Sequence, residues 1–362
     1  LMTTLYENKD VFEIDDKEIS NIEATDKERI HQKKYKEMGA ELIKQGKLAV
    51  CSMAGGQGTR LGFQGPKGTY LLPFEKPMSI FEVECRKLQK ANETYETTIF
   101  WYIMTSRQNH DETVNFFEKN EYFQYSKEHI IFFEQGELPL LDENGKVVLK
   151  NKANVFMAPD GNGGIFKALG REGILTHMKE HGIQYLAIGN VDNILIHMAD
   201  PVILGLMQER KVELASKSFM KPSPEGKWGV FCRINGKPAV IEYIETPKEL
   251  LEARNNQGEL IFGDAHFGCN YFDIGLLERI ETEKLTMHAA HKKNKISIEN
   301  NKEEEIGTYK FEAFIFDAFT KANDILIFRV KKDEEFAPIK NKEGDESPET
   351  AMKLYKNFYH IA

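Results

Sequence analysis

The residues best suited to bind phosphate lie between Ala54 and Gly68. The run AGGQGTRLG at residues 54–62 follows an apolar segment, and Arg60 and Lys67 place two cations seven residues apart. Glycine lets the backbone approach a ligand closely and turn its N–H groups toward anionic oxygens. Glycines and cations in one loop therefore predict a site for a phosphorylated ligand.

The spacing of these glycines differs from two common nucleotide motifs. It reads G-x-G-x-x-x-G from Gly56 to Gly62, one residue off the dinucleotide fingerprint, and no Gly-Lys-Ser/Thr closes the loop as in a P-loop. The spacing thus argues against a dinucleotide-dependent oxidoreductase. Taken alone, the run also fits an ordinary strand-to-helix turn.

Strand-like and helix-like segments alternate around this loop. Apolar, β-branched or aromatic runs of strand length occur at residues 48–53, 97–104, 130–133 and 185–188. Helices are expected at 24–46, 79–90, 111–119 and 164–180, and Asp200-Pro201 is typical of a helix start. This alternation predicts a doubly wound α/β fold, with a mainly parallel sheet and helices on both faces.

The pattern changes after Glu213. Residues 229–233 and 239–244 are predicted to be strands that flank Asn235-Gly236, a strong signal for a hairpin turn. We expect an antiparallel extension of the sheet there, of a kind that often carries a second part of a ligand site. The charge-rich segments 300–306 and 331–335 are expected to be exposed loops.

The composition of the 362 residues limits the possible partners. With 48 Lys and Arg against 57 Asp and Glu, the net charge is −9, which disfavours nucleic acid. The 41% hydrophobic content, with 24 Phe and 13 Tyr, indicates a folded core. No apolar run reaches the ~18 residues of a membrane span and no signal peptide is evident, so no membrane partner is expected. The four cysteines are too widely spaced for a zinc ribbon or a C-x-x-C pair, and we expect a reduced, cytoplasmic protein.

A series of short blocks gives a more specific indication. These blocks are the glycine-rich loop with Pro66-Lys67-Gly68, WYIMTS at 101–106, FFEQG at 132–136, APDGNGG at 158–164, VDN at 191–193, FIFD at 314–317 and FAPIKN at 336–341. Together, and in this order, they resemble the UDP-sugar pyrophosphorylases, most closely the eukaryotic-type UDP-N-acetylhexosamine pyrophosphorylases. The resemblance extends from about residue 48 to 345.

The resemblance implies a fold of the nucleotidyltransferase (Rossmann-like) type and a Mg²⁺-dependent reaction. UTP and a sugar 1-phosphate would give a UDP-sugar and pyrophosphate. Among the cations, Arg60 would meet the departing pyrophosphate, Lys67 would stabilise charge at the α-phosphorus, and Lys340 would reach toward phosphate. Asp192, which follows the strand at 185–188, would contact the nucleotide and hold the magnesium ion. The other matching nucleotide positions are Ala54, Gly55, Gly56, Gln135, Gly161 and Asn162.

On the sugar side, the resemblance assigns Gly229, Glu242, His266, Phe314 and Phe316. Two positions depart from the family: His266 stands where a sugar-binding amide is expected, and Ile244 where a small polar residue is common. We therefore expect N-acetylglucosamine 1-phosphate as the leading sugar substrate. Glucose 1-phosphate, or a broad range of sugars, is the alternative.

The expected organisation has three parts: an N-terminal helical arm at 1–46, a catalytic domain at 47–340 with its sugar-binding part at about 213–320, and a short tail at 341–362. The C-terminal domain of the family is absent from this chain, so the Lys340 segment is expected to be mobile. A non-catalytic UDP-sugar-binding protein is the alternative from another class. Structural roles stay open for Lys67, Asp192, Phe314 and Phe316, and the sequence indicates no oligomeric state.

Overall fold

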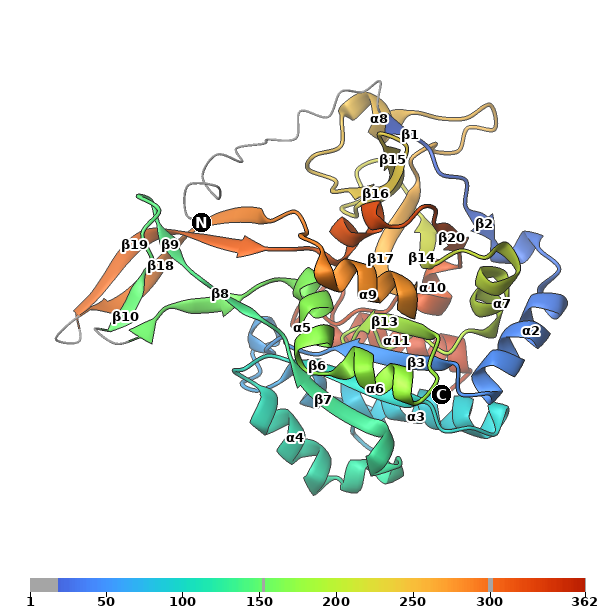
Figure 1. Cartoon of the computed structure of the whole chain (residues 1–362), viewed down its shortest axis with the longest axis horizontal. Helices are drawn as coiled ribbons and strands as arrows, with labels where there is room; N and C mark the ends of the chain where they lie inside the picture. The colour runs from blue at the N-terminus through green and yellow to red at the C-terminus, as the bar shows by residue number, and fades with distance from the viewer. Residues whose placement is uncertain (1–18, 152–153, 299–301, 362) are drawn as a thin grey trace.

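The computed structural model describes residues 19–151, 154–298 and 302–361 and is built around an eleven-stranded mixed sheet (Figure 1). Eight strands form one continuous path. In spatial order they are β2 (Thr25–Asp26), β20 (Leu326–Arg329), β14 (Leu214–Met220), β17 (Asp264–Asp273), β13 (Tyr185–Asn190), β3 (Leu48–Met53), β6 (Phe100–Thr105) and β7 (Ile130–Glu134).

Most neighbours on this path are parallel, as the sequence predicted. β13, β3, β6 and β7 pair in parallel, and so do β14, β20 and β2. Among these described strands, β17 alone runs the other way, between β13 and β14. The predicted mixed, mainly parallel α/β sheet is confirmed.

Helices cover both faces of the sheet and bury two apolar cores. One core contains residues of α2 (Gln32–Lys44), α3 (Ile80–Tyr95), α4 (His110–Lys119), α7 (Pro201–Arg210) and α11 (Pro348–Tyr359). The other contains residues of α5 (Ile165–Arg171), α6 (Ile174–Glu180), α9 (Ile274–Thr282) and the 3-10 helix η8 (Ile315–Lys321). In the described part of the chain, no helix is long and apolar enough to cross a membrane.

Two of the predicted helices are shorter than expected. Residues 24–31 are not helical throughout, because Thr25 and Asp26 pair with β20 and Asp26 then caps a 3-10 turn; α2 begins only at Gln32. The helix expected at 164–180 is interrupted after Arg171, since Gly173 adopts a left-handed conformation with φ of 73°.

Two predicted loops are also wrong, because charged residues there are used in regular structure. The part of 300–306 that is described belongs to β19 (Lys302–Glu312), which pairs along its length with β18 (His288–Ile298). The segment 331–335 contains α10 (Lys332–Glu335), and Glu335 is buried. Local charge density predicts exposure only where no distant partner compensates it.

The hairpin predicted around Asn235-Gly236 is confirmed. β15 (Val230–Ile234) and β16 (Lys237–Ile241) pair across Asn235 and Gly236, both with positive φ. β15 joins the main sheet by one pair, Val230 with Ala265 of β17. Elsewhere, β18 and β19 project from the body as a long arm, beside the short strands β8 (Glu137–Pro139), β9 (Leu141–Asp142), β10 (Leu149–Asn151), β11 (Asn154–Val155) and β12 (Met157–Pro159) (Figure 1).

The described terminal segments are packed into this body. β1 (Ile19–Ser20) pairs with β15 and β2 with β20, so residues 19–46 supply strands as well as the expected helix. At the other end, α11 buries Met352 and Tyr355 in the first core. Residues 1–18 of the predicted arm, and Ala362 of the predicted tail, lie outside the described residues.

A buried lysine links three of these elements. Lys217 of β14 is fully buried; its ammonium donates to Glu335 Oε1 at 2.7 Å and lies 2.9 Å from Asp200 Oδ2. Burial alone would lower the pKa of Lys217, but the two carboxylates outweigh it and raise that pKa. Burial would likewise favour neutral Glu335, yet the ammonium lowers the pKa of that carboxyl. β14, the N-cap of α7 and α10 are thus held by one compensated charge cluster.

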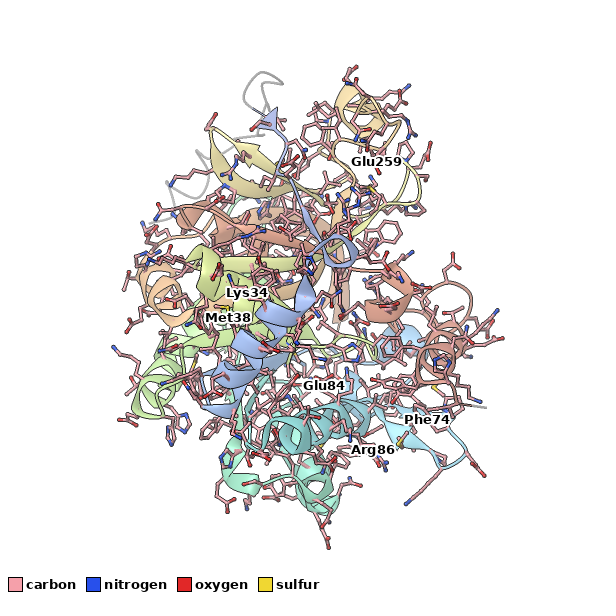
Figure 2. All side chains as sticks on the ribbon, turned by 90° about the vertical axis from the view of Figure 1, so that its right-hand side faces the viewer. Lys34, Met38, Phe74, Glu84, Arg86 and Glu259 are labelled. Carbon is pink, nitrogen blue, oxygen red and sulfur yellow. The ribbon has the colours of Figure 1, made fainter. Side chains whose placement is uncertain are left out.

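Lys217→Met tests this cluster, because it leaves two carboxylates buried without their cation. We expect the free energy of unfolding in urea to fall by about 3–5 kcal/mol. The matched control is Lys34→Met. Lys34 lies on the outer surface of α2 (Figure 2) and pairs with Glu209 of α7. That variant should leave the urea midpoint nearly unchanged. Similar shifts in both variants would show that the buried cluster is not a special contributor.

Candidate active site

The predicted nucleotide residues meet where the order of strands reverses. Along the chain, β3, β6 and β7 follow one another toward one edge, and β13 then starts on the other side of β3. Ligands of open α/β folds bind at the carboxyl ends of the strands at such a switch point. The glycine-rich loop follows β3 and Asp192 follows β13, so both lie at this position.

Lys67 and Asp192 contact each other directly. Lys67 Nζ donates to Asp192 Oδ2 at 2.9 Å, and the two side chains are only 17% and 16% exposed. The loop sets the position of the lysine, because the backbone N–H of Lys67 donates to the carbonyl of Gly56 at 3.0 Å. The structure thus brings together two residues that are 125 positions apart in sequence.

The glycine-rich loop is held by a residue that the sequence analysis missed. The buried Asn109 side chain donates to the carbonyl of Ala54 at 3.0 Å and reaches that of Gly56 at 3.4 Å. The only local signal was its place just before α4. On the other side of the loop, a Cβ on Gly55 would lie 2.2 Å from Gln135 Oε1. Gly55 and Gln135 are therefore adjacent, as their predicted shared role requires.

The turn at Gly161 and Asn162 joins the nucleotide side to the segment that carries Phe314. Asn162 Oδ1 accepts the backbone N–H of Ile315 at 2.9 Å. Gly161 has φ of 88°, and a Cβ there would lie 2.3 Å from the carbonyl oxygen of Ala313. Only glycine fits this close approach. The two chain segments are thus fixed relative to each other.

The Lys340 segment is ordered, contrary to the expected mobility. The backbone N–H of Ile339 donates to the carbonyl of Asp192 at 2.9 Å, and that of Ala337 donates to Asn193 Oδ1 at 2.8 Å. Lys340 Nζ pairs with Glu346 Oε2 at 3.0 Å. These bonds place the segment beside Asp192.

Arg60 is arranged differently from the other two predicted catalytic cations. It lies in the 3-10 helix η3 (Thr59–Leu61) and is exposed. Within the described residues, no hydrogen bond or ion pair involves its guanidinium. An exposed, unpaired guanidinium beside the loop is available to an anionic ligand.

The predicted sugar residues also come together. Gly229 accepts the backbone N–H of His266 at 2.9 Å, and a Cβ on Gly229 would lie 3.3 Å from Glu242 Oε1. Phe314 and Phe316 stack with ring centroids 5.2 Å apart. Burial, with a further contribution from Glu245, raises the pKa of Glu242. A half-buried carboxylate beside aromatic rings is suited to bind sugar hydroxyls.

His266 is packed more tightly than a freely available sugar contact. Its Nε2 lies 3.0 Å from Asn270 Oδ1, and its ring meets the edges of Phe316 and Phe319. Burial lowers the pKa of His266 to about 4, so its imidazole is neutral near pH 7. One ring nitrogen is therefore already used inside the protein.

Two further residues lie in this group and were given no role by the sequence analysis. His288 Nε2 is 3.0 Å from Asp317 Oδ1, and its ring centroid is 4.6 Å from that of Phe314. Asp317 was part of the FIFD block, but nothing in the local sequence pointed to His288. Their contact depends on the pairing of β18 and β19, which was not predicted.

The fold and the switch-point loop define a nucleotide-binding α/β protein, and comparisons with known proteins specify which. Residues 1–361 match the family described as UTP--glucose-1-phosphate uridylyltransferase, and the chain belongs to this family. These enzymes are nucleotidyltransferases, which act on a nucleotide and a sugar phosphate and generally use divalent metal ions.

Individual relatives cover most of the chain. The UDP-N-acetylglucosamine pyrophosphorylase of Saccharomyces cerevisiae is 35% identical over 90% of this chain and 71% of its own length. The crystal structure of a protein from Entamoeba histolytica superimposes on this chain with a TM-score of 0.87. The two sequences are 36% identical, and the match covers 94% of this chain and 88% of the other. The UDP-N-acetylglucosamine pyrophosphorylase of Trypanosoma brucei, whose structure was solved with an inhibitor, is 33% identical to this chain and has a TM-score of 0.82. The match covers 89% of this chain and 67% of the other.

Gly161→Ala tests the close approach between the two sides of the site. The new methyl group would collide with the backbone of Ala313, so we expect a lower melting temperature together with weaker UTP binding. Gly173→Ala is the control, because Gly173 has φ of 73° but no atom within 4 Å of an added Cβ. It bears only the backbone strain, about 1–2 kcal/mol. Equal melting temperatures for the two variants would contradict the close approach.

Proposed function

We propose that this protein joins UTP and N-acetylglucosamine 1-phosphate, releasing pyrophosphate. An oxygen of the sugar phosphate attacks the α-phosphorus of UTP, a new P–O bond forms, and the bond to the departing pyrophosphate breaks in line. Such a step depends on positioning and on neutralising charge rather than on a protein nucleophile. The observation that carries the proposal is the Lys67–Asp192 contact at the switch point of a family-matched fold.

The three cations would divide the negative charge among them. Lys67, fixed by Gly56, is suited to stabilise charge that grows at the α-phosphorus. Arg60 is exposed and unpaired within the described residues, so it can bind the departing pyrophosphate. Lys340 lies on a segment bonded to Asp192 and would exchange Glu346 for a phosphate oxygen.

The residues fit a Mg²⁺ ion that is shared with the substrate. Within the described residues, no group of three or more His, Cys, Asp or Glu side chains could hold a metal ion alone. Mg²⁺ usually takes one or two carboxylates and completes its shell with water and phosphate oxygens. Asp192 would supply this carboxylate, and the bound ion would neutralise phosphate charge. Lys67 and the ion are then alternative counter-charges for Asp192.

The sugar preference is supported by the named relatives rather than by the family description. The yeast and trypanosome proteins are named for N-acetylglucosamine, whereas the family description names glucose 1-phosphate. Two features favour glucose 1-phosphate as a second candidate. His266 replaces an expected amide and is bonded to Asn270, and Ile244 is 75% exposed beside Glu242.

The setting we propose is the cytoplasm. The four cysteines are free and buried, as is usual for a protein kept in a reducing compartment.

The deciding assay measures pyrophosphate release from UTP and Mg²⁺ with N-acetylglucosamine 1-phosphate and glucose 1-phosphate in parallel. Release with either sugar supports the chemistry, and the ratio of the two rates identifies the preferred one. UTP binding without release from any sugar phosphate would instead indicate a non-catalytic binding protein. Absence of both binding and release would refute the proposed function.

Substitutions of Lys67 and Asp192 are predicted to affect different kinetic quantities. Lys67→Met should lower kcat by about 10²-fold with little change in UTP affinity, because its charge acts in the transition state. Asp192→Asn should raise the Mg²⁺ concentration needed for half-maximal rate, whereas Lys67→Met should not. Asp111→Asn, an exposed change on α4, serves as the control. An unchanged metal titration for Asp192→Asn would assign that carboxylate a structural role.

His266→Asn tests the sugar side. The amide restores the residue type expected in the family, so we predict a shift of kcat/KM toward N-acetylglucosamine 1-phosphate relative to glucose 1-phosphate. An unchanged ratio of the two kcat/KM values would mean that residue 266 does not contribute to the sugar preference.

A further inference from the structure

His288 and Asp317 join two distant elements at the edge of the sugar-side group. His288 is the first residue of β18, and Asp317 lies in η8. The imidazole Nε2 is 3.0 Å from Asp317 Oδ1 and 3.1 Å from Oδ2. The aspartate side chain is 9% exposed and the histidine 29%, so the pair is largely shielded from water. A shielded, charge-assisted contact of this kind is stronger than an exposed one.

The same aspartate fixes the backbone of Phe314. Asp317 Oδ2 accepts the N–H of Phe314 at 2.6 Å and so caps η8. The rings of His288, Phe314, Phe316 and His266 then form one row, with successive centroids 4.6, 5.2 and 5.8 Å apart. His288 is the outer end of this row and Asp317 is its anchor.

The charges around His288 are mostly negative. The hydrogen bond that His288 donates to Asp317 raises the pKa of His288, while burial opposes that shift. Glu245 and Glu242, on the segment that follows β16, add to the increase. In the opposite direction, His288 offsets the burial that raises the pKa of Glu242. When His288 is protonated, its charge favours the ionised form of Glu242.

We propose that His288 is a positioning residue for sugar recognition: through its hydrogen bond to Asp317 and its ring contact with Phe314, it fixes the Phe314–Phe316 wall. This inference rests on the proposed function and concerns the sugar half of that site. The wall favours a sugar that carries an acylamino group, because that group offers an apolar methyl to the aromatic rings.

The two contributions are separable by substitution. His288→Gln retains an N–H that can donate to Asp317 but loses the ring beside Phe314, whereas His288→Ala loses both. His291→Gln is the matched control, since His291 lies on the same strand, is exposed and pairs with Glu143 on the arm. The assay determines KM for each sugar 1-phosphate and for UTP, together with kcat.

For His288→Gln, we expect KM for the sugar 1-phosphates to rise by less than about tenfold, with the preference between sugars kept, because the donor to Asp317 remains. For His288→Ala, we expect a larger rise and a loss of preference for the N-acetylated sugar. In both variants KM for UTP should change by less than about twofold, and His291→Gln should resemble the wild type. Binding of UDP-N-acetylglucosamine, measured by calorimetry, should weaken in parallel while UTP binding does not.

Other outcomes overturn the proposal. An equal rise in KM for UTP would mean that His288 supports the fold in general, and an unchanged sugar preference in His288→Ala would remove its role in the wall. If wild-type protein turns over a sugar 1-phosphate but the variants behave like it, only the inference on His288 fails. If the wild-type protein releases no pyrophosphate with either sugar 1-phosphate and does not bind UTP, both the proposed function and the inference on His288 fail.

Discussion

The ammonium of Lys217 imposes a constraint on much of the molecule. A charge in the core is tolerated only when partners surround it, and here the partners come from the start of α7 and from α10. Glu335, the last residue of α10, directly precedes the segment that ends at Lys340. Hydrogen bonds join this part of the chain to Asn193 and Asp192. Lys217, which is not one of the predicted ligand-binding residues, therefore helps to fix the position of the segment that carries Lys340.

The parts of the fold that follow from local pattern were predictable. Apolar runs of strand length, the helix start at Asp200 and the Asn235-Gly236 turn all appear where the sequence places them, because each depends on residues within a few positions. α10 and β19 were not predictable in this way. Their charged residues are explained by Lys217 and by strand β18, which lie far away in the sequence.

The same distinction applies to the site. The phosphate-binding role proposed for Lys67 is based on its glycine-rich surroundings, and the strand before Asp192 places that carboxylate at the same sheet edge. Asn109 and His288 could not be found from the sequence, since one acts on a loop more than fifty positions away and the other reaches Asp317 across a β-arm. Local motifs identify what touches a ligand; long-range contacts determine which residues hold those groups in place.

The β15–β16 hairpin pairs with the central sheet at one position, Val230 with Ala265, and its Phe231 and Val240 side chains pack into the second apolar core. The hairpin also has its own small apolar core, with Cys232 and Ile241 among its members. Because only one strand pair joins the hairpin to the sheet, the register of β3 and β13, which precede the glycine-rich loop and Asp192, does not depend on the turn at Asn235 and Gly236.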